Sequence, residues 1–344
     1  MSERRLATER VRTEVVRALS DRPLLGQRLL VAASGGVDST CLAHVLAGLA
    51  AEGDFEVALG HVHHGLRGHE SDGDEAAVSA LARDLGVAYR FQRAEPGPIR
   101  SGRSSRERPT IQEAARAVRY DALRSMAAEW GATRIATAHT ADDQTETVLL
   151  RLLRGAGPDS LSGIPARSEG GRLVRPLLGV GRDDLLAYAA ENGLAWREDS
   201  SNASSDYARN RLRNQWIPGL AKDFNPRLNQ AIRRLVEAQA RDRAWLEDLV
   251  EEEFSRRFHR EASGAWMDCD GWASLPDGLA LRLARRTLGD LGIGRDVTSV
   301  HLQRLSAFLG AETAAGELEF PGGVRVRRQG TRGHVYRVHG NRPC

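Results

Sequence analysis

The sequence predicts an α/β protein with a doubly wound parallel sheet, followed by a smaller and mainly helical C-terminal domain. Apolar, strand-like runs alternate with helical patterns in the first half of the chain, which is typical of a parallel sheet covered on both faces. Polar and glycine-rich segments follow the ends of these runs, where such sheets bind ligands. Arginine-rich helical patterns then replace the strands. We therefore expect a first domain over 1–215 and a second over 216–344.

Each element is assigned from its own periodicity and punctuation. The predicted strands are 28–33, 55–62, 87–91, 134–138 and a short one at 194–197. The predicted helices are 5–19, one beginning near 41, 74–85, 110–130, one ending near 153, 181–192, and one or two helices over 225–258. Residues 94–109 are rich in Pro, Gly, Ser and Arg and predict a loop. Alternation and glycines near 322–328 predict a basic hairpin after the last helices.

Composition narrows the class of protein. The chain has 344 residues, a net charge of +3 and a single lysine, Lys222, so catalysis by an enzyme lysine is not favoured. Its three cysteines, Cys41, Cys269 and Cys344, form no CxxC pair, which excludes a disulfide framework and a compact thiolate metal site. The sequence has neither an N-terminal apolar segment nor an 18-residue apolar stretch. We expect a cytoplasmic protein that does not associate with a membrane.

The first polar segment is Ser34-Gly35-Gly36-Val37-Asp38-Ser39, between a predicted strand and a predicted helix. Two glycines allow the backbone to turn tightly and to approach a ligand closely. The N–H groups of such a turn and of the following helix face an anion together. A phosphate-binding loop is therefore expected here, although it lacks the lysine of a Walker A loop.

A second group of chemical residues lies where the fourth predicted strand ends. Asp143 and Glu146 are three residues apart at a helix start, so they share a face, and His139 precedes them. Together with Asp38 they are the candidate catalytic residues, and Asp38 and Asp143 are the candidate ligands of Mg²⁺, which would neutralise charge on a phosphate. The alternative is that Asp142 or Asp143 only caps the helix; both roles can coexist.

Basic and histidine-rich segments surround these candidates. His61, His63 and His64 do not predict a zinc site, because alternate strand residues face opposite ways, and the following turn with Arg67 reads better as a substrate-contacting loop. Arg116 and Arg119 lie one helical turn apart and fit phosphate contact. The cluster 209–213 offers either a nucleic-acid footprint or a solvated helix surface.

SGGVDS resembles the pyrophosphate loop of the N-type ATP pyrophosphatases, the PP-loop superfamily. The further motifs narrow the resemblance to the tRNA(Ile)-lysidine synthetases. These motifs are HVHHGLR at 61–67, EAAR..RY at 113–120, AHTADDQTET at 138–147, RPLL at 175–178, EDSSN at 198–202 and RNRLR at 209–213. The resemblance is strong over roughly 25–215 and diffuse beyond. It implies an adenine nucleotide alpha hydrolase-like fold.

The resemblance also implies a reaction. ATP, with Mg²⁺, would adenylate the C2 carbonyl oxygen of the wobble cytidine in the CAU anticodon of tRNA(Ile), and L-lysine would then displace AMP to give lysidine. The loop 34–39 would bind ATP. The residues implied in substrate or tRNA binding are His63, Arg67, Glu113, Arg116, Arg119, Asn202, Arg209 and Arg213. The acidic residues could also bind the incoming amine.

Two other functions stay open from the sequence. A tRNA thiolase of the same superfamily is less favoured, since thiolases commonly use paired cysteines. A catalytically silent tRNA-binding protein is opposed by the intact SGGVDS loop and the Asp143/Glu146 pair. The sequence also leaves a homodimer open.

Overall fold

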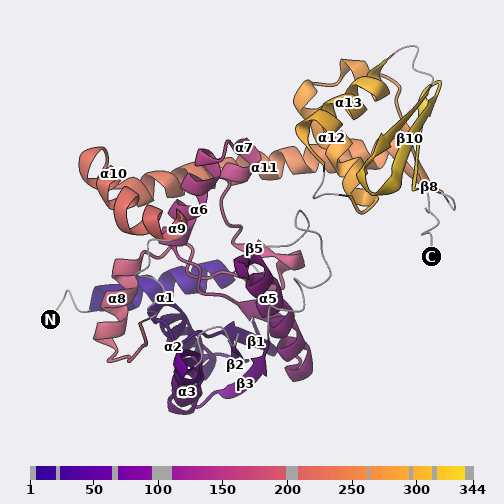
Figure 1. Cartoon of the computed structure of the whole chain (residues 1–344). Coiled ribbons are helices and arrows are strands. Elements are labelled where there is room, and N and C mark those ends of the chain that lie inside the picture. Colours follow the sequence, from indigo (N-terminus) through magenta and orange to yellow (C-terminus); the bar gives the residue numbers. More distant parts are fainter. Residues whose placement is uncertain are drawn as a thin grey trace. The chain divides into compact units, whose positions relative to one another are not determined.

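The computed structural model describes residues 5–20, 24–63, 69–94, 111–198, 208–261, 264–293, 297–311 and 316–337. The chain forms two compact units, Met1–Ala238 and Gln239–Cys344 (Figure 1). The division at residue 215 that the sequence suggests stays a prediction. The predicted loop at 94–109 lies outside the described residues from 95 onward.

The first unit is built on a six-stranded sheet in the order β3-β2-β1-β4-β6-β5. Its strands are β1 (Gln27–Ala32), β2 (Phe55–His63), β3 (Ala88–Arg93), β4 (Arg134–Ala136), β5 (Arg167–Ser168) and β6 (Leu173–Val174). Every pairing is parallel except β5 with β6. The ligand-binding edge is therefore the carboxyl end of β1, β2 and β4, as in other open parallel sheets.

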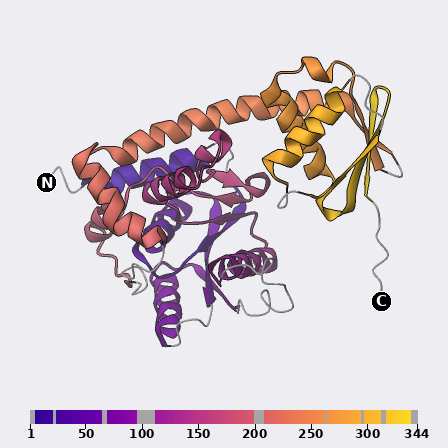
Figure 2. The ribbon, with the colours of Figure 1, turned by 45° about the horizontal axis from the view of Figure 1, so that its top comes forward.

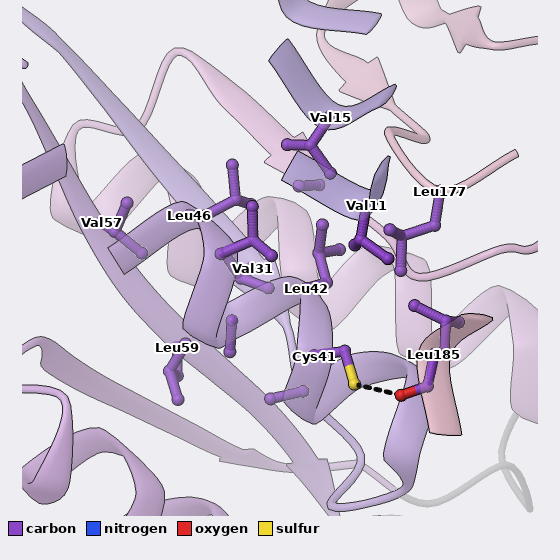
Figure 3. Packing of buried hydrophobic residues seen from close by; sticks show 14 of the residues in the cluster. Val11, Val15, Val31, Cys41, Leu42, Leu46, Val57, Leu59, Leu177 and Leu185 are labelled. Carbon is purple, nitrogen blue, oxygen red and sulfur yellow. Dashed lines mark hydrogen bonds between the residues drawn. The ribbon is translucent and has the colours of Figure 1, made fainter. Parts of the chain in front are cut away.

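Helices cover both faces of this sheet, which confirms the doubly wound prediction. They are α1 (Arg5–Leu19), α2 (Val37–Glu52), α3 (His69–Asp84), α5 (Ile111–Trp130) and α8 (Arg182–Glu191). The helices α6 (Ala141–Leu153) and α7 (Pro158–Leu161) pack against each other instead. Because side chains alternate along a strand, Leu29 and Val31 of β1 face the core formed with α1, α2, α3 and α8. Figure 3 shows Val31 among side chains of this core. Leu30 faces the other core, formed with α5.

The predicted strand at 194–197 is wrong. Residues 194–198 have no strand partner among the described residues and run irregularly. The backbone N–H of Arg197 instead donates to the carbonyl of Gly35 at 3.0 Å. A short alternating pattern cannot form a strand without a neighbouring strand to pair with, and here the glycine-rich loop takes its hydrogen bond.

Beyond α8 the first unit is helical. The chain passes through α9 (Ala208–Arg211), a π-helical turn η3 (Leu212–Trp216) and α10 (Ile217–Asp223) into α11 (Leu228–Arg257). Figure 2 shows α11 as one unbroken helix, so the predicted region 225–258 is one helix. Ile232 and Val236 of α11 bury Val148 of α6 in a small cluster. No helix in the described ranges is long and apolar enough to cross a membrane.

The second unit holds a five-stranded antiparallel sheet in the order β7-β8-β11-β10-β9. Its elements are β7 (Phe258–Glu261), β8 (Gly264–Asp268), α12 (Asp277–Asp290), α13 (Ser299–Gly310), β9 (Gly316–Phe320), β10 (Val324–Gln329) and β11 (Arg332–Arg337). The predicted hairpin near the end is confirmed as β10–β11. The predicted C-terminal part over 216–344 is mainly helical, and it also holds this sheet, of which the sequence predicted only the hairpin.

Candidate functional site

The glycine-rich loop joins β1 to α2 at the carboxyl edge of the sheet. The Ser39 hydroxyl donates to the Gly36 carbonyl at 3.0 Å and accepts from the Ser34 backbone N–H at 3.1 Å. Gly35 has a φ of +87°, and Gly36 is the N-cap of α2. A glycine cap has no side chain to satisfy the first N–H groups of the helix, so these donors are left for an anion.

Gly35→Ala is expected to lower the free energy of unfolding by about 1–2 kcal/mol, because left-handed backbone is costly for an L-residue with a Cβ. Crowding is not the cause, since the nearest atom to an added Cβ, the Asp74 carbonyl oxygen, is 3.7 Å away. Urea unfolding measures the loss. Gly48→Ala, inside α2 with no atom within 4 Å of the added Cβ, is the control and should not lose stability; equal losses in both variants would contradict the conformational explanation.

The loop opens into a cavity of about 730 Å³. The predicted site residues that line this cavity are Ser34, Gly36, Val37, Asp38, Ser39, His63, Arg116, Arg119, His139, Asp143, Arg209 and Arg213. Glu113 lies exposed on α5 and does not line it. Arg67 and Asn202 lie outside the described residues. Segments far apart in the sequence thus meet at one edge of the sheet.

Asp38 lies in the loop with one carboxylate oxygen buried. Its Oδ1 has no hydrogen-bond partner among the described residues, and its Oδ2 lies 3.9 Å from Nη1 of Arg182. Burial raises the pKa of Asp38 to about 6, and the nearby charge of Asp143 adds to the rise. A buried carboxylate without enough compensating charge is suited to bind a cation.

Asp143 does cap α6, as the structural alternative predicted. Its Oδ2 accepts from the Thr140 backbone N–H at 2.9 Å, and the Thr140 hydroxyl accepts from the Asp143 N–H at 3.3 Å, which makes a capping box. Its Oδ1 stays on the cavity side and accepts from Nη2 of Arg209 at 2.7 Å. Capping therefore uses one oxygen and leaves the other for the site.

Asp143, Glu146, Arg209 and Arg213 form a group that we call the charge cluster. Glu146 is 1 % exposed, with Nε of Arg209 on its Oε2 at 2.6 Å and Nε of Arg213 bonded to its Oε1. Nη2 of Arg213 also lies 3.6 Å from Oδ1 of Asp143. The negative charges of the two carboxylates are matched by the positive charges of the two guanidinium groups, as buried charged groups require.

His139 lines the cavity beside the charge cluster. Its Nδ1 lies 2.9 Å from the Thr137 hydroxyl. Burial lowers the pKa of His139 to about 4; Asp143 opposes this effect, while Arg175, Arg116 and Arg119 reinforce it. The ring is therefore neutral at physiological pH, able to form hydrogen bonds but carrying no charge.

The two described histidines of β2 have separate partners. Nδ1 of His61 lies 2.9 Å from the Ala33 carbonyl, and Nε2 of His63 lies 3.1 Å from Oδ1 of Asp72. No group of three metal-ligating side chains occurs in the described part of the chain. These contacts position β2 and α3 next to the loop.

Three arginines near the cavity escaped the sequence reasoning. Arg182, at the first position of α8, points its guanidinium at Asp38, while its backbone N–H donates to Asp142 Oδ2 at 2.8 Å. Arg197 donates to Asp74 Oδ1 at 2.8 Å. Arg175 is buried and adds positive charge near His139. The only sequence signal was the RPLL motif, since Gly181-Arg182 reads simply as a helix start.

Two family models match the chain. Residues 7–220 match the PP-loop domain, and residues 267–333 match the TilS substrate binding domain. A tRNA(Ile)-lysidine synthase from Chlorobaculum tepidum is 36 % identical over 231 residues, covering 67 % of each protein. The chain belongs to the tRNA(Ile)-lysidine synthase family.

Two further synthases of this family are similar in sequence to most of the chain. The protein from Symbiobacterium thermophilum is 37 % identical over 92 % of this chain, and that from Geobacter sulfurreducens 36 % identical over 88 %. The chain covers 66 % and 64 % of the lengths of these two relatives. The match of the second unit to the TilS substrate binding domain extends the likeness past the region that the sequence motifs covered.

The fold is shared more widely than the family. The U34-tRNA thiolase NcsA from Methanococcus maripaludis, solved with its [4Fe-4S] cluster, superposes with a TM-score of 0.56 at 18 % identity, over 68 % of this chain and 80 % of the thiolase. This likeness concerns the fold alone. In this synthase-family chain Cys41 and Cys269 are buried in different cores, and burial raises their thiol pKa values to about 12 and about 11.

Proposed function

We propose that this protein uses ATP to ligate L-lysine to C2 of the wobble cytidine in the CAU anticodon of tRNA(Ile). The C2 carbonyl oxygen attacks the α-phosphate and pyrophosphate leaves; the lysine ε-amine then attacks C2, AMP leaves with the C–O electrons, and nitrogen loses a proton. The anticodon then reads AUA instead of AUG. The observation that carries the proposal is one cavity lined by the glycine-rich loop and by Asp143, Arg209 and Arg213 of the charge cluster.

The acidic residues at the loop fit Mg²⁺. The unpartnered buried Oδ1 of Asp38 supplies the hard oxygen ligand that this ion prefers. Oδ1 of Asp143 already accepts from Arg209, so Asp38 is the better ligand of the two. When bound, the ion neutralises charge on the leaving pyrophosphate. The N–H groups at the start of α2 bind the same oxygens from the protein side.

The charge cluster suits a zwitterionic amino acid. A guanidinium binds a carboxylate through two parallel hydrogen bonds, so Arg209 or Arg213 can take the α-carboxylate of lysine. Asp143 lines the cavity and can accept a hydrogen bond from the α-ammonium group of lysine. Glu146 is buried behind the two arginines. Glu146 therefore orients the arginines.

The remaining cavity wall suits the nucleotide. Arg116 and Arg119 stack near the Tyr120 ring, with guanidinium carbons 5.1 and 5.7 Å from its centroid, and offer cations to tRNA phosphates. Neutral His139 can hydrogen-bond the cytidine. A single unstacked base is the form in which RNA sequence is read in loops.

Purified protein incubated with ATP, Mg²⁺, radiolabelled lysine and an unmodified CAU-anticodon tRNA(Ile) transcript tests the proposal. Label in the RNA that depends on ATP and is absent with tRNA(Met) supports it. AMP and pyrophosphate released only with a sulfur donor would identify a thiolase. Binding of tRNA without ATP cleavage would favour a silent tRNA-binding protein.

Arg182→Gln is expected to lower kcat/KM for ATP by about 10- to 100-fold, the size of a lost charge-assisted hydrogen bond. Arg182 lines the same cavity as the loop and is the largest favourable charge near Asp38, so it is placed to contact the triphosphate. Steady-state kinetics at varied ATP measures the effect. Arg83→Gln, an exposed arginine at the end of α3, is the control; equal kinetics in both variants would contradict the role.

We also propose that the protein is located in the cytoplasm and forms a homodimer. Free tRNA and ATP, the substrates, share the cytoplasm. Light scattering on the purified protein, with and without tRNA, decides the oligomeric state.

A further inference from the structure

Two large exposed aromatic side chains follow the arginines of the charge cluster in the sequence. Trp216, at the end of η3, is 63 % exposed, and Phe224, after α10, is 81 % exposed. Both belong to the first unit, whose other large apolar side chains are mostly buried in its cores. An exposed aromatic ring beside basic side chains is the kind of surface on which an unpaired base stacks.

The segment that carries these aromatics is strongly basic. Residues 208–234 contain seven arginines and lysines against a single acidic residue, Asp223, and include Lys222, the only lysine of the chain. The whole chain is nearly balanced, with 49 basic and 46 acidic residues. A local excess of this kind is complementary to a polyanion.

The segment begins with residues that line the cavity. Arg209, Arg213 and Asn214 line the cavity, and Trp216 follows two residues later. Leu212 is buried and anchors the turn. The π-helical turn therefore carries Arg213 on the cavity side and ends at exposed Trp216. Such turns occur frequently at functional sites.

We propose that Trp216 and Phe224 form a stacking platform for unpaired anticodon-loop nucleotides that flank the target cytidine. A nucleotide in the cavity must leave its stack, so its neighbours lose stacking partners. Aromatic side chains beside basic ones replace that stacking for single-stranded RNA. The inference rests on the proposed function, because that function brings an anticodon loop to this cavity.

The experiment measures binding of a fluorescent hairpin with the CAU anticodon loop, and lysidine formation, by the full-length protein. Trp216→Ala and Phe224→Ala are each expected to weaken hairpin binding by about 5- to 150-fold, the range for one base–aromatic stack. Trp216→Phe should restore most of the affinity. KM values for ATP and lysine should stay unchanged. Both side chains are exposed, so folding is preserved, and thermal unfolding verifies this.

Trp245→Ala is the matched control, because Trp245 is also 63 % exposed but lies on α11 in the second unit. It should bind the hairpin as the wild type does. Hairpin affinity within twofold of wild type in Trp216→Ala and Phe224→Ala overturns the platform, as does a change in self-association without a change in RNA binding. A wild-type protein that binds the hairpin but never incorporates lysine overturns the proposed function instead.

Discussion

Replacing Asp38 by Asn is expected to stop adenylation and to leave the protein at least as stable as the wild type. The carboxylate has a buried oxygen without a partner among the described residues, and an amide cannot replace its charge toward a cation. Loss of one electrostatic group at a reacting phosphate costs on the order of 10²–10³-fold in rate.

Whereas the rate of adenylation should fall, the free energy of unfolding of Asp38→Asn should equal or exceed that of the wild type at neutral pH. Burial raises the pKa of Asp38 from 3.8 to about 6, so the folded state loses stability as the pH rises through that interval. Asn carries no charge and avoids this loss.

Pyrophosphate–ATP exchange in the presence of tRNA measures the rate, and thermal unfolding at pH 7.5 measures stability. Asp84→Asn, an exposed aspartate at the end of α3, is the control for the substitution itself. Full exchange by Asp38→Asn would remove Asp38 from the reaction. A large drop in melting temperature would mean that the charged form stabilises the fold.

Asp143→Asn is expected to abolish lysidine formation while leaving tRNA binding and folding nearly intact. Asp143 is the N3 residue of the capping box, a position that both carboxylate and amide side chains occupy, so Asn can keep the bond from the Thr140 N–H. What disappears is the negative charge that faces Arg209 and the cavity. Incorporation of labelled lysine, filter binding of tRNA and urea unfolding together separate these effects.

Thr140→Ala supplies the complementary variant. It removes the side-chain cap of α6 but leaves both carboxylates of the charge cluster, and should lower the free energy of unfolding by about 1 kcal/mol with activity retained at low temperature. If Asp143→Asn modified tRNA at the normal rate, the carboxylate would have no role beyond capping.

The sequence predicted those elements whose formation depends on residues close together in the chain. The loop 34–39, β1 and α6 follow from apolar runs, glycines and a capping sequence within a dozen residues. The paired roles of Arg209 and Arg213 could not be predicted, because the carboxylates that they contact lie more than 60 residues earlier in the chain. The predicted tRNA roles of these arginines stay predictions.

The second unit and Arg182 show the same limit. Trp266 sits on the open face of β8, and Gly333 replaces an apolar residue on the buried side of β11, so the strands have a weak period of two. Arg182 gains its place near Asp38 only because α8 docks on α2. Contacts between segments that are distant in the sequence cannot be predicted from local sequence patterns.

The start of α11 sets a lower bound on any working fragment of the first unit. Asn229 donates to Oδ1 of Asp142 at 3.0 Å, and Ile232 and Val236 cover Val148. A chain trimmed at residue 215 would expose the apolar side of α6, the helix that bears Asp143 and Glu146. Expression trials of a minimal fragment should therefore retain the chain to at least residue 238. Residues 216–238 include the side chains of α11 that hold α6 in place.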